Sequence, residues 1–168
     1  YTYKKLIPKL VKNNNHIFSI RENKMEADDI IAIITKYLSN KKKKIPIYLI
    51  SGDEDFKQLG NEHVNFIDYR TKKIKVLSKK EAKENLLNKI IKGDCSDNIP
   101  SIFPKGFKTK EKKDLIGDNK KLKKYLKENK NVMKQFIINQ KLIDFNMIPK
   151  KYIKKIIKEF STIENNNF

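Results

Sequence analysis

Hydrophobic residues in the first half of the chain follow two patterns. In some segments they recur every three or four positions, which is typical of a helix with one buried face. In others they form short runs rich in Ile, Val and Tyr, which are typical of buried strands. Together the patterns predict helices over about residues 2–12, 25–40, 56–59 and 79–92, and strands over 16–20, 45–50, 64–69 and 73–77.

The pattern changes beyond Gly93, where loop residues lead into helical spacing without a further strand. Helices are predicted over about residues 109–116, 119–129, 131–144 and 150–160, the last beginning after Pro149. Lysines alternate through 73–77, which predicts that this strand lies at a sheet edge. The chain is therefore predicted to be an α/β protein with a helical second half.

The chain of 168 residues has a formal net charge of +19, and the charge is uneven. Residues 101–168 carry 18 Lys and Arg against 7 Asp and Glu, so the second half is the stronger electrostatic footprint for nucleic acid. An AT-rich coding bias, which enriches Lys, Asn and Ile, is the alternative explanation for individual lysines. Such a bias does not explain where the acidic residues lie.

Cys95 is the single cysteine, which excludes an intramolecular disulfide and favours a reducing compartment. The two histidines, His16 and His63, are distant from it in sequence, so we expect no catalytic thiol. No apolar run approaches the ~20 residues that a membrane span needs, and no signal-peptide pattern opens the chain. The sequence predicts a soluble intracellular protein.

Seven of the thirteen acidic residues among the first 100 positions gather into three tight clusters. Carboxylates brought together by folding raise one another's pKa unless a cation compensates them. Mg²⁺ and Mn²⁺ prefer such oxygen ligands, and the lysine-rich background favours a polyanionic substrate. The clusters therefore predict a metal-dependent nuclease, and they are Glu26 with Asp28 and Asp29, Asp53 with Asp55, and Asp94 with Asp97.

Each cluster also has a purely structural explanation. Acids near residue 26 stand at a helix amino terminus, where the helix dipole favours negative charge. Asp53 and Asp55 follow a predicted strand and could form a turn, although extended backbone would point both carboxylates the same way. Asp94 and Asp97 could form Asx turns or a helix cap. A shared site explains all three clusters at once.

Three strings resemble the successive motifs of the flap endonuclease family of structure-specific 5′ nucleases: EADDIIA at 26–32, SGDEDFKQL at 51–59 and KGDCSDNIPSI at 92–102. LIDFNMIP at 142–149 further resembles the ribonuclease H branch of that family in T-even phages. The resemblance implies a PIN-like, Rossmann-like nuclease core followed by a helix-three-turn-helix DNA-binding motif. It assigns residues 1–92 to the carboxyl-terminal part of the core and 93–168 to the DNA-binding region and terminal helices.

The resemblance also implies two divalent ions, Mg²⁺ or Mn²⁺, that activate water for an in-line displacement. A first site would draw on Asp28 and Asp53, and a second on Asp55 and Asp97, which makes these four the predicted catalytic residues. The full set of predicted metal ligands is Glu26, Asp28, Asp29, Asp53, Asp55, Asp94 and Asp97.

Residues 98–109 resemble the family's hairpin, which presents backbone amides and often a K⁺ ion to duplex phosphates. Pro104 and Ser101 stand where the family has glycines, and proline removes an amide donor, which weakens the expectation of K⁺. Solvated surface lysines are the alternative reading. The residues predicted to contact nucleic acid are Lys105, Gly106, Lys108, Thr109 and Lys110.

We therefore expect a 5′-3′ exonuclease and flap endonuclease that cuts DNA, or RNA primers in DNA:RNA duplexes, during replication or repair. The expected protein is monomeric and binds duplexes with a 5′ flap or end, with a replication clamp or single-strand-binding protein as a further partner. The family's first strand and helical arch have no counterpart in residues 1–24, so we expect both upstream. Two alternatives stay open: a non-catalytic DNA-binding module and a PIN-type ribonuclease.

Overall fold

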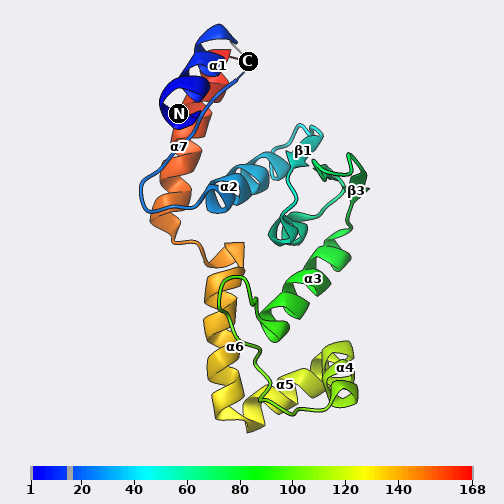
Figure 1. Ribbon diagram of the computed structural model, residues 1–168. Helices are drawn as coiled ribbons and strands as arrows, with labels where there is room; N and C mark the ends of the chain where they lie inside the picture. The colour runs from blue at the N-terminus through cyan, green and yellow to red at the C-terminus, as the bar shows by residue number, and fades with distance from the viewer. Residues whose placement is uncertain (1, 15–16, 168) are drawn as a thin grey trace. The chain divides into compact units, whose positions relative to one another are not determined.

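The computed structural model describes residues 2–14 and 17–167 (Figure 1). The chain forms two compact units, and each is described by itself. One consists of Tyr1–Ile45 with Ile148–Phe168, and the other is Pro46–Met147. The predicted division into a nuclease core (1–92) and a DNA-binding region with terminal helices (93–168) stays a prediction.

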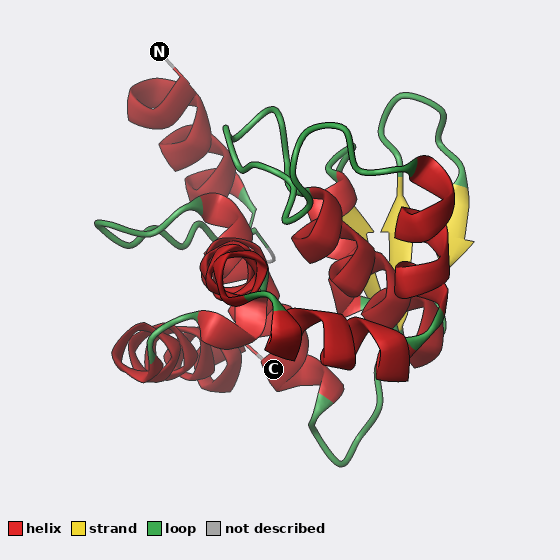
Figure 2. Cartoon of the chain, turned by 90° about the horizontal axis from the view of Figure 1, so that it is seen from below, coloured by secondary structure: helices red, strands yellow, loops and turns green. Residues whose placement is uncertain are grey.

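The unit Pro46–Met147 contains a three-stranded sheet, drawn in yellow in Figure 2. Strand β1 (Ile47–Ile50) pairs in parallel with β2 (Val64–Ile67), and β3 (Ile74–Val76) pairs antiparallel with β2. The 3-10 helix η2 (Glu54–Leu59) lies in the connection between β1 and β2. The three strands confirm the apolar runs predicted there, and β3 is at the sheet edge that its lysines predicted.

Helix α3 (Lys79–Lys92) follows the sheet with the bounds that the sequence predicted. A capping box starts it, in which the Ser78 hydroxyl accepts the N–H of Glu81 and the Glu81 carboxylate accepts the N–H of Ser78. Such a cap stabilises a helix by roughly 1 kcal/mol. Ile90 and Ile91 are buried on the inward face, so the helix end next to the acidic loop is held by packing.

The helices of the second half confirm the helical spacing read from the sequence, to within one or two residues. They are α4 (Thr109–Gly117), α5 (Asn119–Glu128) and α6 (Lys130–Ile143), followed by the 3-10 helix η3 (Phe145–Met147).

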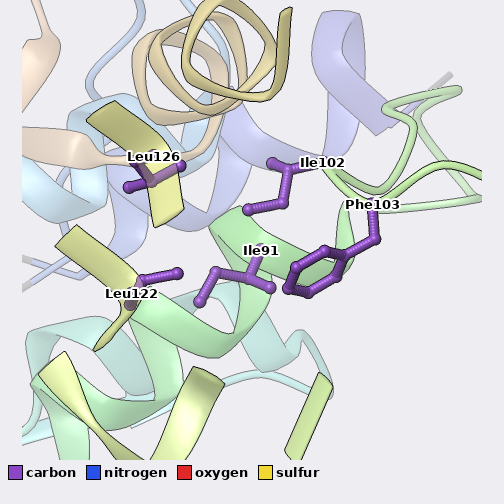
Figure 3. Close-up of a cluster of buried hydrophobic side chains, with 5 residues drawn as sticks. All are labelled: Ile91, Ile102, Phe103, Leu122 and Leu126. Atoms are coloured by element: carbon purple, nitrogen blue, oxygen red, sulfur yellow. The ribbon is translucent and has the colours of Figure 1, made fainter. Parts of the chain in front are cut away.

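One hydrophobic cluster joins α3 and α5 to the loop that leaves α3 (Figure 3). The ring centroid of Phe103 lies 4.7 Å from that of Phe107, and the Phe107 ring contacts Tyr125 of α5 edge-on at 5.7 Å. The loop is therefore fixed by its own aromatic side chains. The buried members are Ile91, Ile102, Phe103, Leu122 and Leu126.

The fully buried side chain of Asn139 connects three parts of this unit. Its amide group donates to the carbonyl oxygens of Ile90 and Pro100, at 2.8 Å each, and its carbonyl oxygen accepts a hydrogen bond from Gln135 at 2.7 Å. Buried polar groups are stable only when paired in this way. Asn139 therefore holds the end of α3 and the following loop against α6.

Gln58 makes a second amide connection, between η2 and the segment after α6. Its amide nitrogen donates to the Ile143 carbonyl at 2.9 Å, and its oxygen accepts the Phe145 N–H at 3.0 Å. The Phe56 and Phe145 rings stack alongside with centroids 6.3 Å apart. The strings SGDEDFKQL and LIDFNMIP are thus joined in space.

In the other unit, α2 (Ala27–Ser39) packs on α7 (Lys150–Asn167). Ile30 and Ile33 form a buried cluster with Ile156, and the ends of the helices are further joined by contacts such as the edge-on pair of Tyr37 and Phe160 at 5.9 Å. Helix α7 is longer than its apolar spacing predicted. Among the described residues, no helix is both long and apolar enough to cross a membrane.

The amino-terminal segment of this unit differs in part from the prediction. Thr2–Leu6 is a π-helix that leads into α1 (Ile7–Asn13), in agreement with the helix predicted there. The strand predicted at 16–20 is wrong over 17–20, which has no regular structure, and His16 lies outside the described residues. Apolar character alone does not make a strand, because a strand also needs a neighbour to accept its backbone hydrogen bonds.

Replacing Asn139 with leucine is expected to lower the free energy of unfolding by about 2–4 kcal/mol, because two buried carbonyls lose their donor. Urea denaturation followed by circular dichroism measures the change. Asn131→Leu is the matched control, since Asn131 lies on the same helix and is exposed. If Asn139→Leu were as stable as the wild type, the Ile90 and Pro100 carbonyls would have to find other partners.

Candidate metal centre

Three aspartates of Pro46–Met147 meet at one place. Asp55 comes from the first turn of η2, and Asp94 and Asp97 come from the loop after α3. One carboxylate oxygen from each lies within 4.8 Å of the other two. The side chains of Asp55 and Asp94 are only 19% and 16% exposed, whereas Asp97 is exposed. The structure thus brings together three of the seven predicted ligands.

The side chains of Asp53 and Asp55 lie in different surroundings. The backbone is extended at Asp53 but turns into η2 at Glu54, so the extended conformation expected through both aspartates is wrong. The Asp53 carboxylate caps η2 by accepting the Asp55 N–H at 2.9 Å, and the exposed side chain lines a cavity of about 210 Å³. Only Asp55 joins the cluster, because capping directs the two side chains differently.

A tight turn positions Asp94. Its backbone exchanges two hydrogen bonds of 2.8 Å with Ile99, and its Oδ1 accepts the Ser96 N–H at 2.9 Å, which is the predicted Asx turn. Gly93 enters this turn with φ of 74°, and an added Cβ would lie 2.3 Å from the Ile99 carbonyl oxygen. Only glycine fits there. The Asx turn uses one oxygen of Asp94, so its Oδ2 is left for another partner.

That partner is Lys89, a residue that the sequence analysis missed. Its ammonium is ion-paired with Asp55 Oδ1 and lies 2.7 Å from Asp94 Oδ2. The hydrogen bond from Lys89, together with those from Ser96, lowers the pKa of Asp94 from 3.8 to about 2. The sequence contains a signal for this residue. Lys89 lies one turn after Leu86, on the half-buried side of α3, and a lysine is unusual among the apolar residues of such a face.

The donor set of this cluster fits a hard divalent cation. All three residues offer carboxylate oxygens, which are the ligands that Mg²⁺ and Mn²⁺ prefer. Asp55 Oδ1 is buried and accepts no hydrogen bond of normal geometry from the described residues, although Lys89 is its ion-pair partner. A buried carboxylate oxygen without a hydrogen bond is unfavourable unless a cation is close to it.

The remaining acidic cluster belongs to the other unit, at the amino terminus of α2. The Asp28 carboxylate accepts the N–H of Asp29 at 2.9 Å, whereas Glu26 makes no side-chain cap. Burial raises the pKa of Asp29, and the charges of Asp28 and Glu26 raise it further. This is the mutual repulsion expected of crowded carboxylates. Whether these residues share a site with Asp55 stays a prediction.

The segment predicted to contact nucleic acid is a turn followed by a helix start. The Phe107 N–H donates to the Pro104 carbonyl at 3.2 Å, and Gly106 has φ of 84°. Thr109 begins α4. The three lysines of the segment, at 105, 108 and 110, are exposed. Their contact with nucleic acid and the K⁺ site remain predictions.

Residues 4–87 match the family described as the N-terminal resolvase-like domain of 5′-3′ exonucleases. The chain is also 29% identical to the ribonuclease H of Enterobacteria phage T4, in a match that covers 83% of this chain and 50% of that protein. The chain thus spans about half the length of this curated relative.

Solved structures with the same fold come from phage T5. A substituted T5 5′-exonuclease is 21% identical, with a TM-score of 0.68 over 92% of this chain and 72% of that one. A T5 protein co-crystallised with metal ions has a TM-score of 0.67 at 21% identity, and a T5 flap endonuclease complex with DNA and metal ions has 0.65 at 18%. Both cover 92% of this chain and 65% of the T5 chain.

Asp94→Asn is expected to be less stable than the wild type near neutral pH and to lose this difference in acid. The pKa of Asp94 is lower in the folded state than in an unfolded chain. Its charge therefore stabilises the fold above about pH 4, and the contribution is lost as the pH falls through about 2. Urea unfolding over a pH series measures the difference.

Asp114→Asn is the control for this series, because Asp114 is an exposed carboxylate on α4. Its stability relative to the wild type should change little with pH. A constant difference between wild type and Asp94→Asn over the whole series would mean that the Lys89 ion pair does not stabilise the fold.

Proposed function

The chain belongs to the 5′-3′ exonuclease family by its N-terminal resolvase-like domain, and from this membership we propose that the protein is a metal-dependent 5′-3′ exonuclease and flap endonuclease. It hydrolyses phosphodiester bonds in DNA, or in RNA primers of DNA:RNA duplexes. The observation that carries the proposal is the meeting of Asp55, Asp94 and Asp97 within 4.8 Å on this family's scaffold. A cluster of oxygen ligands in a chain of net charge +19 suits chemistry on a polyanion.

Mg²⁺ or Mn²⁺ is the proposed cofactor, with two ions in the complete site. Asp55, Asp94 and Asp97 would hold one of them. When bound, such ions lower the pKa of water and stabilise the leaving oxygen of a phosphodiester. The further proposed ligands are Glu26, Asp28, Asp29 and Asp53. A T5 protein with this fold was crystallised with metal ions, which supports the same class of cofactor here.

Duplex DNA, or a DNA:RNA duplex, with a 5′ flap or end is the proposed substrate. The excess of lysine in residues 101–168 supplies the general attraction to phosphates. The turn at Pro104–Phe107 is fixed on α5 by aromatic packing. It contains the exposed Lys105 and is followed by the exposed Lys108 and Lys110, so it offers a defined place for a phosphate. A T5 flap endonuclease of this fold was solved with DNA, which supports this choice.

K⁺ at this turn, and a replication clamp or single-strand-binding protein as partner, are finer parts of the same proposal. Gly106 of the turn lies in the left-handed region and has no side chain, so a phosphate or an ion can approach the backbone closely. Pro104 has no N–H, so the turn offers a phosphate one amide donor fewer, whereas a K⁺ ion would be held by carbonyl oxygens.

The double substitution Asp55→Asn with Asp97→Asn is expected to abolish cleavage and leave DNA binding nearly unchanged. Two amides replace two of the three carboxylates that would hold a cation, while the lysines are untouched. The measurement is release of short products from a 5′-labelled flap duplex in Mg²⁺, beside binding by fluorescence anisotropy. Asp114→Asn with Asp118→Asn, on and beside α4, is the matched loss of charge.

Cleavage by the double variant at the wild-type rate would contradict the metal assignment. If wild type itself binds the duplex without cutting it, the DNA-binding part is retained but these residues alone do not complete the first metal site.

Lys105→Ala and Lys110→Ala are each expected to weaken duplex binding and to lower the slope of log Kd against log salt by about 1. Each removes one exposed ammonium beside the turn. Binding titrations at several salt concentrations give the slope. Lys83→Ala, an exposed position on α3, is the control. Equal effects at all three positions would mean that the lysines act only as diffuse surface charge.

A further inference from the structure

The cation present in the aspartate cluster is a side chain of the protein itself. Lys89 is ion-paired with Asp55 and lies 2.7 Å from Asp94 Oδ2, and only 24% of its side chain is exposed. We propose that Lys89 is a built-in counter-ion of the cluster, and that a divalent ion binds there by displacing its ammonium. The inference rests on the proposed metal site and adds what controls occupancy of that site.

The space around Lys89 favours displacement over coexistence. Asp55, Lys89, Leu86 and Ile143 are among the residues that surround the adjoining cavity, whose volume is about 20 Å³. That is room for about one water molecule. The cavity borders Asp55 but neither Asp94 nor Asp97, so on this side of the ammonium there is no room for a hydrated divalent ion.

Charge favours the same conclusion. An ammonium within contact distance of two carboxylates repels a divalent ion that approaches those carboxylates, and the repulsion is strong where water is scarce. Asp55 Oδ1 is such a place, because it is buried. The ion and the ammonium therefore compete for the same oxygen atoms.

The lysine side chain is suited to leaving. Its charge is a compact group on a flexible four-carbon stem, unlike the planar and directional fork of arginine. Lys89 is rooted in α3, and its neighbours Ile90 and Ile91 are buried, so the ammonium can move while the helix stays in place. In the absence of a divalent ion, Lys89 keeps three mutually repelling carboxylates together.

Lys89→Met separates these two effects. We expect the variant in EDTA to melt roughly 5 °C below the wild type, because the carboxylates lose their counter-ion. We expect it to bind Mn²⁺ on the order of tenfold more tightly, because the competitor is gone. Differential scanning fluorimetry measures the first effect, and electron paramagnetic resonance of free Mn²⁺ measures the second. Neither readout depends on nuclease activity.

Lys92→Met is the matched control, since Lys92 is exposed, lies one turn away on α3 and carries the same charge. It should change neither value. Adding Asp97→Asn to Lys89→Met should remove the gain in Mn²⁺ affinity, which assigns the gain to this cluster. If Lys89→Met is too unstable to titrate, Lys89→Gln makes the same comparison with a neutral side chain that still donates a hydrogen bond.

The outcomes distinguish the two levels of the proposal. If the wild type binds Mn²⁺ through Asp97 and loss of the Lys89 charge leaves the affinity equal or weaker, the counter-ion role is overturned and the metal centre stands. If Mn²⁺ binds to the Lys89 variant but not to the wild type, the competition is confirmed, and the Lys89 ammonium excludes the ion from the wild-type cluster. If none of the proteins binds Mn²⁺, both the competition and the proposed cofactor are wrong.

Discussion

Mutual repulsion among three carboxylates is the constraint that Pro46–Met147 has to satisfy. Asp55, Asp94 and Asp97 offer oxygen atoms within 4.8 Å of one another, and two of the side chains are largely buried. Such an arrangement is unstable without a cation. Lys89 supplies that cation from α3, and the pKa of Asp94, lowered to about 2, reflects its closeness. Further contacts of the unit hold η2 and the loop after α3, which carry the aspartates.

Two side-chain amides, of the buried Asn139 and the half-buried Gln58, do much of this holding. Asn139 joins the carbonyls of Ile90 and Pro100, which lie on either side of the Asp94 turn. Gln58 joins η2, which carries Asp55, to the backbone of Ile143 and Phe145. An amide can donate and accept at once, so each side chain fixes a distance between segments far apart in sequence. This explains why the LIDFNMIP string accompanies the acidic motifs without supplying a ligand.

Charge is arranged on two scales. The excess of lysine over the whole chain attracts polyanions at long range. Salt screens this attraction, and the attraction does not select one phosphate. Lys89 acts at contact distance on Asp55 and Asp94, whose side chains are only partly exposed to water. Under the proposed function, the first scale brings a nucleic acid to the surface and the second decides when the cluster can accept a metal ion.

Local chemistry explains the parts of the structure that the sequence predicted. The apolar runs at 47–50 and 64–67 form strands, and the helical spacing of 79–92 forms α3. These features depend on neighbouring residues, so they are legible in the chain. The acidic residues are also grouped along the sequence, and this grouping includes the three aspartates of the cluster.

Tertiary contacts decided the rest. The run at 17–20 is apolar but is not a strand, because pairing requires a partner that local sequence does not specify. Asp53 and Asp55 look equivalent in the chain, yet one caps η2 and the other joins the cluster, because backbone hydrogen bonds determine where each carboxylate points. Lys89 is one of 39 basic residues, and its position three residues after Leu86 does not by itself specify its contacts with two aspartates. Burial and long-range pairing arise only when the chain folds. They therefore give different roles to residues that have the same composition and spacing in the sequence.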